Sequence, residues 1–170
     1  KDENLAKMYF TRGLFYKNKD DLTNALKDFE NIENMDISFN DENYFVESAH
    51  LFYKSNNFEK SKKQFKSYID KCEKNELKSI CWHYFIQSSI KLAEKDNTKE
   101  DLANDLALFI KNSSLSTNEK IDYTILLCKT KMELNNYSDA LNDLLSIIET
   151  SNELKNCLRS IFYSLSAISI

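Results

Sequence analysis

The sequence offers few residues that could form a metal site. Its two histidines, His50 and His83, lie far apart along the chain, and Cys81 stands close to the second of them. The spacing of Cys72, Cys81 and His83 matches no usual zinc-binding pattern and supplies no evident fourth ligand. We therefore interpret these cysteines as ordinary small residues beside a helix start, and we expect neither a metal nor another cofactor.

The residues needed for catalysis are not arranged for it either. A nucleophile needs a neighbouring base and a group that orients it, and no serine is spaced with a histidine and an acid in that way. One glycine cannot build the glycine-rich loop that cradles phosphate groups. We interpret Asp20–Asp21 as a turn followed by an acidic first helical turn, and Asp41–Glu42 as another helix start. The sequence therefore predicts a protein that is not an enzyme.

The composition favours helices joined by short polar connections. One glycine and no proline in 170 residues leave little means of making tight hairpins. With 42% hydrophobic and 12% aromatic residues, the chain can bury a core. A formal net charge of −4 argues against nucleic acid as a partner. No apolar run approaches the roughly 18 residues of a membrane span, so we expect no direct membrane insertion.

A repeating pattern runs along most of the chain. Three small residues, Ala25, Ser61 and Ala140, can be placed in register. Each has a large residue three places before it and another four places after it, at spacings that bury one face of a helix. The large residues are Leu22 and Phe29, Phe58 and Phe65, and Tyr137 and Leu144.

The helix before each of these carries a signature of its own. A large residue is followed by a small pair and a second large residue, as in Phe45, Ser48–Ala49 and Phe52. The same spacing recurs at Phe85, Ser88–Ser89 and Leu92 and at Tyr163, Ser166–Ala167 and Ile170, while Gly13 and Cys128 take the small position elsewhere. On this register, repeats cover about residues 6–41, 42–81, 82–120 and 121–159, with a half repeat at 160–170.

This pattern resembles the tetratricopeptide repeat (TPR), and the resemblance covers nearly the whole chain. It is most specific at Gly13, Tyr16, Ala25 and Phe29 and at residues 136–140. The chain departs from the family in having intervals above the usual length of roughly 34 residues and no proline to close a repeat. The resemblance implies an all-α fold, a right-handed α-solenoid of antiparallel helix pairs. It would form one domain over residues 1–170, with about four repeats plus one extra C-terminal helix.

Individual helix boundaries can be placed along the chain, least securely in the third repeat. Its connection from Glu94 to Glu100 is predicted to be long, and either Ala103 or Leu106 takes the alanine position. Ser116 and Glu119 form a capping box at the start of the next helix. Helices are expected over about residues 4–17, from about 42, over 58–72 and over 77–93, and a polar turn is expected at 135–136.

The C-terminal residues match only the first half of a repeat. Residues 167–170 are apolar, whereas solenoids end in a capping element with a polar outer face. We therefore expect a fragment of a longer protein, whose C-terminal end is covered by further repeats or by a partner. Because nothing suggests paired cysteines, a reducing compartment and a cytoplasmic location are favoured, although a removed signal sequence or anchor stays open.

In TPR-like arrays the first helices line a concave groove, and the resemblance implies that a ligand would lie there. An apolar row in this groove marks either a binding surface or a surface filled by the protein's own chain, and the sequence leaves both open. The predicted peptide- or protein-binding residues are Phe10, Val46, Ile86 and Ile125, then Leu14, His50, Ile90 and Lys129, with Lys17, Tyr53 and Met132 beside them.

The residue types in the predicted groove indicate which kind of partner it would bind. Chaperone-binding members of the family hold a peptide carboxylate with lysine and asparagine, but the corresponding positions here are Phe10, Leu14, Val46 and His50. We therefore expect a non-enzymatic scaffold or adaptor for protein–protein interaction, binding a helical or extended apolar peptide segment. Two alternatives stay open: a peptide-sensing regulatory domain of a larger regulator, and an architectural subunit of a large assembly.

Overall fold

The computed structural model describes residues 2–35, 39, 41–71 and 75–150, and this part of the chain forms eight α-helices without a β-strand. The prediction of an all-helical protein is therefore confirmed, while the predicted half repeat at 160–170 lies outside the described residues. The chain divides into two compact units. The first is residues 1–97 with α1 to α5, and the second is residues 98–170 with α6 to α8. The helices are α1 (Asp2–Asn18), α2 (Leu22–Glu33), α3 (Glu42–Lys54), α4 (Phe58–Lys71), α5 (Asn75–Asp96), α6 (Lys99–Asn112), α7 (Thr117–Glu133) and α8 (Tyr137–Thr150).

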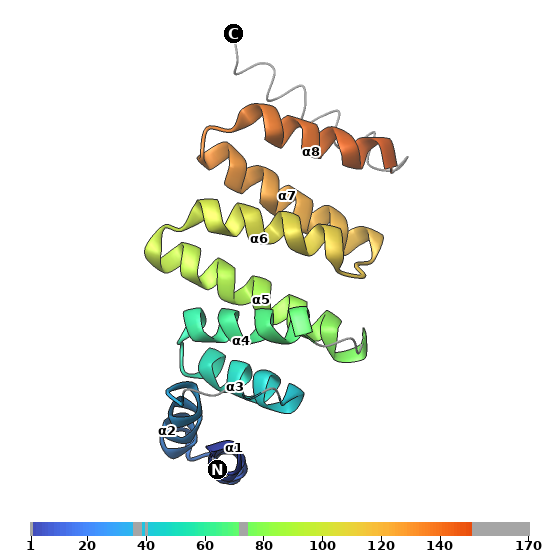
Figure 1. Ribbon diagram of the computed structural model, residues 1–170. Helices are drawn as coiled ribbons and strands as arrows, with labels where there is room; N and C mark the ends of the chain where they lie inside the picture. The colour runs from blue at the N-terminus through green and yellow to red at the C-terminus, as the bar shows by residue number, and fades with distance from the viewer. Residues whose placement is uncertain (1, 36–38, 40, 72–74, 151–170) are drawn as a thin grey trace. The chain divides into compact units, whose positions relative to one another are not determined.

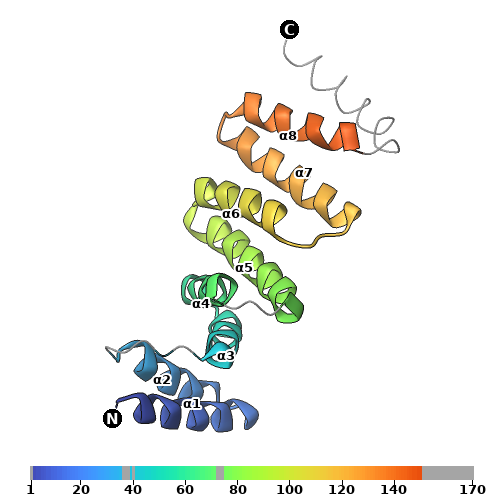
Figure 2. The same ribbon diagram turned by 45° about the vertical axis from the view of Figure 1, so that its right-hand side comes forward.

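Within each unit, helices that follow one another in the chain pack against one another. In the first unit α1 packs on α2, α2 on α3, α3 on α4 and α4 on α5. Figure 2 shows α1 and α2 lying side by side and joined by a tight turn, so that they run in opposite directions. In the second unit α6 packs on α7 and α7 on α8, as Figure 1 shows.

One backbone geometry recurs just before α2, α4, α6 and α8. The residue two places before each helix has φ between 56° and 61°, the left-handed region that glycine usually supplies. Asparagine and aspartate tolerate this region because their short polar side chains bond locally. In the turn that joins α1 to α2, the Asp21 N–H donates a hydrogen bond to the Tyr16 carbonyl. The residues with positive φ are Asp20, Asn56, Asn97 and Asn135.

A small residue on α1, on α3 and on α7 lets the following helix approach. The only glycine, Gly13, faces α2, where an added Cβ would lie 2.7 Å from Cε1 of Phe29 and 3.4 Å from Cβ of Asp28. A side chain at this position would therefore overlap a ring that is itself fully buried. The equivalent positions of α3 and α7 hold the buried small residues Ala49 and Cys128.

A tyrosine–phenylalanine contact joins one helix pair to the next. Tyr44 of α3 lies 5.9 Å from Phe29 of α2, and Tyr84 of α5 lies 5.4 Å from Phe65 of α4, between ring centroids. In the second unit, Tyr123 of α7 lies 4.7 Å from Phe109 of α6. All three phenylalanines are fully buried. A tyrosine therefore contacts a buried phenylalanine at each described junction between one helix pair and the next.

The predicted helix starts are confirmed at one place and corrected at another. Ser116 and Glu119 form the expected capping box, with both reciprocal hydrogen bonds present. The acidic first turn expected after Asp20–Asp21 is wrong. Asp20 is the positive-φ residue, and Asp21 is the N-cap, whose carboxylate accepts a hydrogen bond from the Asn24 N–H at 3.2 Å. The first helical turn of α2 itself contains no acidic residue.

The long connection expected between residues 94 and 100 is also wrong, because α5 continues to Asp96 and α6 begins at Lys99. An ion pair between Lys91 and Glu94 lies within this last part of α5. The first helical hydrogen bond of α6 is donated by Leu102, in the place that Ala25, Ser61 and Ala140 hold in their helices. By this count the alanine position belongs to Leu102, rather than to either residue that the sequence suggested.

A salt bridge satisfies the one buried carboxylate between α1 and α2. Asp28 keeps only 2% of its surface exposed, and the Arg12 guanidinium donates to it through Nε at 2.8 Å and Nη2 at 2.6 Å. These two bonds raise the pKa of Arg12 above its usual value, mainly through hydrogen bonding to the carboxylate. Since a buried charge without a partner is costly, Arg12 fixes how α1 lies on α2.

We predict that Gly13→Ala destabilises the first unit. The gain in helix propensity of about 1 kcal/mol is outweighed by overpacking against Phe29, which costs typically 1–3 kcal/mol. Urea unfolding followed by circular dichroism should therefore show a net loss of roughly 1 kcal/mol. The double variant Gly13→Ala/Phe29→Leu removes the ring edge that the methyl group meets. It should lose less than the two single changes added together, and simple additivity would show that the close approach is not the cause.

Candidate functional site

The predicted binding residues of the first unit separate into buried and partly exposed ones. Phe10 keeps only 9% of its surface, and its ring lies 5.9 Å from Phe29, 6.1 Å from Phe39 and 5.8 Å from Tyr44. Ile86 is fully buried. Neither side chain has surface for a ligand to contact, so we assign both to the core. At these two positions the protein's own chain covers the side chains that the sequence placed in a groove.

The remaining predicted residues of this unit are half-buried, and they come from α1, α3 and α5. The aromatic and charged members among them have described partners, which define one region around α3. These half-buried residues are Leu14, Lys17, Val46, His50, Tyr53 and Ile90.

An aromatic cluster forms where α3, α4 and α5 meet. Its members are His50, Tyr53, Phe58, Phe65 and Tyr84. Between ring centroids, Tyr84 lies 4.5 Å from His50 and 5.6 Å from Tyr53, and it stacks on Phe65 at 5.4 Å with an angle of 12° between the planes. Phe58 lies 5.4 Å from Tyr53. Phe65 is fully buried, whereas the other four residues keep part of their surface accessible.

Opposite charges flank this cluster on two sides. Lys17 of α1 forms an ion pair with Glu47 of α3, three residues before His50 on the same helix. On α5, Lys91 pairs with Glu94 at 2.9 Å, and this pairing raises the pKa of Lys91, with a smaller contribution from Tyr53. Each lysine near the cluster is therefore paired with a carboxylate.

The cluster changes the acidity of its histidine. Burial lowers the pKa of His50 below its usual value, because an imidazolium ion is poorly solvated among the rings. Glu47 acts in the opposite direction, while Lys17 and Lys54 lower the pKa further. At neutral pH His50 is therefore a neutral aromatic ring with hydrogen-bonding edges, suited to contact a ligand without adding charge.

Tyr84 is the member of the cluster that sequence reasoning missed. It occupies the place in α5 that Tyr44 holds in α3 and Tyr123 holds in α7, one residue before the large residue of the repeat signature in the first two cases. Tyr44 is 3% exposed, and burial raises its pKa above the usual range, whereas Tyr84 is half-buried. A recurring tyrosine in register was therefore the available signal. Which tyrosine keeps free surface depends on the packing.

Three predicted binding residues belong to the second unit. All lie on α7, where Ile125 and Met132 are half-buried and Lys129 is exposed. The neighbouring Cys128 is buried, and its thiol donates to the Ala140 carbonyl at 3.4 Å. These residues form a half-exposed stretch of one helix, and their role in binding stays a prediction.

The two described cysteines, Cys81 and Cys128, are buried, and His83 contacts a carbonyl of its own helix. Burial raises the pKa of the Cys128 thiol to about 11, so it stays protonated and is a poor nucleophile at neutral pH. Cys81 is fully buried in α5, and Nδ1 of His83 lies 3.1 Å from the carbonyl of Ser79. No cluster of three potential metal ligands occurs within the described part of the chain. Cys72 lies outside it.

Comparison with protein-family models finds no match, and comparison with curated proteins finds none either. The description of the site therefore depends on the chain's own geometry. Among the residues described, no helix combines the length and the apolar character that crossing a lipid bilayer requires.

We predict that His50 makes the stability of the first unit depend on pH. Its folded-state pKa is lowered, so the unfolded chain binds more protons as the solution becomes acidic. The contribution to stability is complete above the ordinary histidine pKa and is lost as the pH falls through the lowered one. Urea unfolding between about pH 5 and 7 should show stability falling with acidity. His50→Gln should reduce this slope, and an unchanged slope would contradict the assignment.

Proposed function

We propose that this chain is a non-enzymatic scaffold for protein–protein interaction, built as a TPR-like, right-handed solenoid of helix pairs. Three recurring features support the repeat assignment: the Asp or Asn turn at positive φ, the small residue on the first helix, and the tyrosine–phenylalanine contact between pairs. The turns, the small residues and the tyrosines recur at intervals of 36 to 41 residues, close to the spacing of the sequence repeat. A repeated unit that packs only on its neighbours is typical of solenoid proteins.

The aromatic cluster is the single observation that carries the binding proposal. Tyr53 and Tyr84 are only partly buried, although their rings contact other aromatic rings. Tyrosine side chains held in this way offer a large contact area and lose little conformational entropy on binding, which is why they are enriched at binding hot spots. Phe65 is fully buried, and because Tyr84 stacks on it, the motion of the Tyr84 ring is restricted.

The chemistry of the cluster indicates the partner. One or two apolar side chains of a helical or extended peptide would pack on Tyr53 and Tyr84, while His50 and the two ion pairs would meet polar groups at its edges. Burying each such side chain contributes about 1.5–3 kcal/mol, from which the cost of ordering the peptide is subtracted. The expected affinity is in the micromolar range, typical of an adaptor with exchangeable partners.

We predict that removing the ring of Tyr53 or of Tyr84 weakens peptide binding. Peptides selected against the chain from a random display library should bind the Tyr53→Ala variant and the Tyr84→Ala variant at least ~10-fold more weakly than the unaltered chain. Fluorescence anisotropy measures the affinities, and circular dichroism verifies that each variant keeps its helices.

The matched control is Tyr137→Ala, which removes a tyrosine that is 59% exposed at the start of α8, in the second unit. It should leave peptide affinity unchanged. If the selected peptides bind all three variants as they bind the unaltered chain, the aromatic cluster is not the binding surface. The proposal would then be wrong in its central part.

A further inference from the structure

His50 lies within the proposed binding surface rather than beside it. Its ring centroid is 4.5 Å from that of Tyr84 and 5.2 Å from that of Phe65, and both contacts are edge-to-face. His50, Tyr53 and Tyr84 are all half-buried. His50 and Tyr53 stand three residues apart on α3, so they share one face of that helix. A peptide that packs on the two tyrosines therefore also covers part of the imidazole.

The charged groups that act on His50 come from two helices. Glu47 and Lys54 stand on α3, about one helical turn on either side of it. Lys17 of α1 forms an ion pair with Glu47. Burial lowers the pKa of His50 most strongly, Glu47 raises it, and the two lysines lower it further. A proton on His50 therefore leaves three cations, Lys17, Lys54 and the imidazolium ion, around the carboxylate of Glu47.

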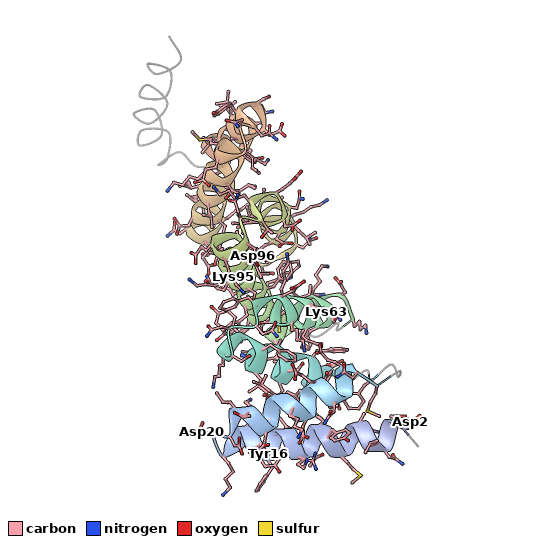
Figure 3. All side chains as sticks on the ribbon, turned by 90° about the vertical axis from the view of Figure 1, so that its left-hand side faces the viewer. Asp2, Tyr16, Asp20, Lys63, Lys95 and Asp96 are labelled. Atoms are coloured by element: carbon pink, nitrogen blue, oxygen red, sulfur yellow. The ribbon has the colours of Figure 1, made fainter. Side chains whose placement is uncertain are left out.

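The other two helices packed here face His50 with aromatic rings. Phe65 comes from α4 and Tyr84 from α5. Lys91 of α5 is held by Glu94 at 2.9 Å. Figure 3 labels three further charged residues of α4 and α5, which are exposed and are not among the groups that shift the pKa of His50: Lys63, Lys95 and Asp96. Within the described residues, Glu47 is therefore the carboxylate that acts on the imidazole.

We propose that the aromatic cluster is a pH-dependent binding surface, which holds an apolar peptide while His50 is neutral and releases it when His50 is protonated. This proposal rests on the proposed function of the cluster as a peptide-binding surface. A peptide that covers the imidazole removes water from it. An imidazolium ion beside two lysines is costly to remove from water, because a buried charge needs a partner. Protonation of His50 and peptide binding therefore oppose each other.

This linkage sets the direction and the range of the effect. Covering His50 lowers its pKa in the complex below the already lowered value of the free chain. The affinity is therefore complete above the ordinary histidine pKa, and it falls as the pH drops through the pKa of the free chain. Each unit by which the peptide lowers this pKa weakens binding by up to about tenfold.

Fluorescence anisotropy with one labelled peptide, measured between about pH 7.5 and 5, tests the proposal. The peptide is selected against the chain at neutral pH, contains no aspartate, glutamate or histidine and has blocked termini, so only the protein titrates. Its affinity for the unaltered chain should fall at least ~3-fold over this range. Circular dichroism at each pH verifies that the chain keeps its helices.

Two histidine variants identify the group that titrates. His50→Gln should remove the fall in affinity, whatever its affinity at neutral pH. The matched control is His83→Gln, which removes the other histidine of the chain and should leave the fall in affinity complete. Nuclear magnetic resonance gives a second readout, since the ring protons of His50 should titrate at a lower pH with the peptide bound than without it.

The outcomes separate this proposal from the proposed function. If Tyr84→Ala weakens binding at neutral pH and His50→Gln removes the pH dependence, both are supported. If Tyr84→Ala weakens binding but the affinity is independent of pH, or depends on it equally in His50→Gln, this proposal alone is overturned. If neither Tyr53→Ala nor Tyr84→Ala weakens binding, the peptide binds elsewhere, and the proposed function is overturned together with this proposal.

Discussion

The backbone turn at positive φ is the constraint on which the rest of the structure depends. A chain with one glycine has to place Asp20, Asn56, Asn97 and Asn135 in the left-handed region instead. Within each unit, the turns at Asp20, Asn56 and Asn135 reverse the chain within a few residues, so they fix which faces of the two flanking helices can meet. The small residue on the first helix, Gly13 in the first pair, then becomes a requirement for close packing.

The aromatic residues are divided between sealing the core and forming a surface. Where the first pair meets α3, Phe10, Phe29, Phe39 and Tyr44 contact one another, and all are buried. Where α4 meets α5, Tyr84 stacks on the buried Phe65 but keeps part of its own surface. The same tyrosine position therefore serves packing at one junction and is available for recognition at the next. Recognition is added where packing leaves a ring partly uncovered.

The sequence pattern was sufficient for the helical architecture but only partly for the site. Turn residues and the small positions are local signals, so helices and the Ser116 capping box could be predicted. The prediction for the third repeat was wrong for two reasons. Leu102 stands where the other repeats have the small residue that sets the register, and α5 extends to Asp96. Phe10 and Ile86 were misplaced because periodicity identifies a helix face without showing how deeply the neighbouring helices cover it. The same limit hid Tyr84, whose exposure depends on three helices.

The most direct test of the turn's role is the urea unfolding of two variants at Asn56, an exposed residue between α3 and α4. Glycine adopts positive φ without strain, whereas alanine does not. If the positive-φ turns stabilise the fold, Asn56→Ala lowers the free energy of unfolding by about 1 kcal/mol. Asn56→Gly then changes it by less than about 0.5 kcal/mol. Equal losses in the two variants would contradict this account, because the left-handed backbone would then not be what Asn56 supplies.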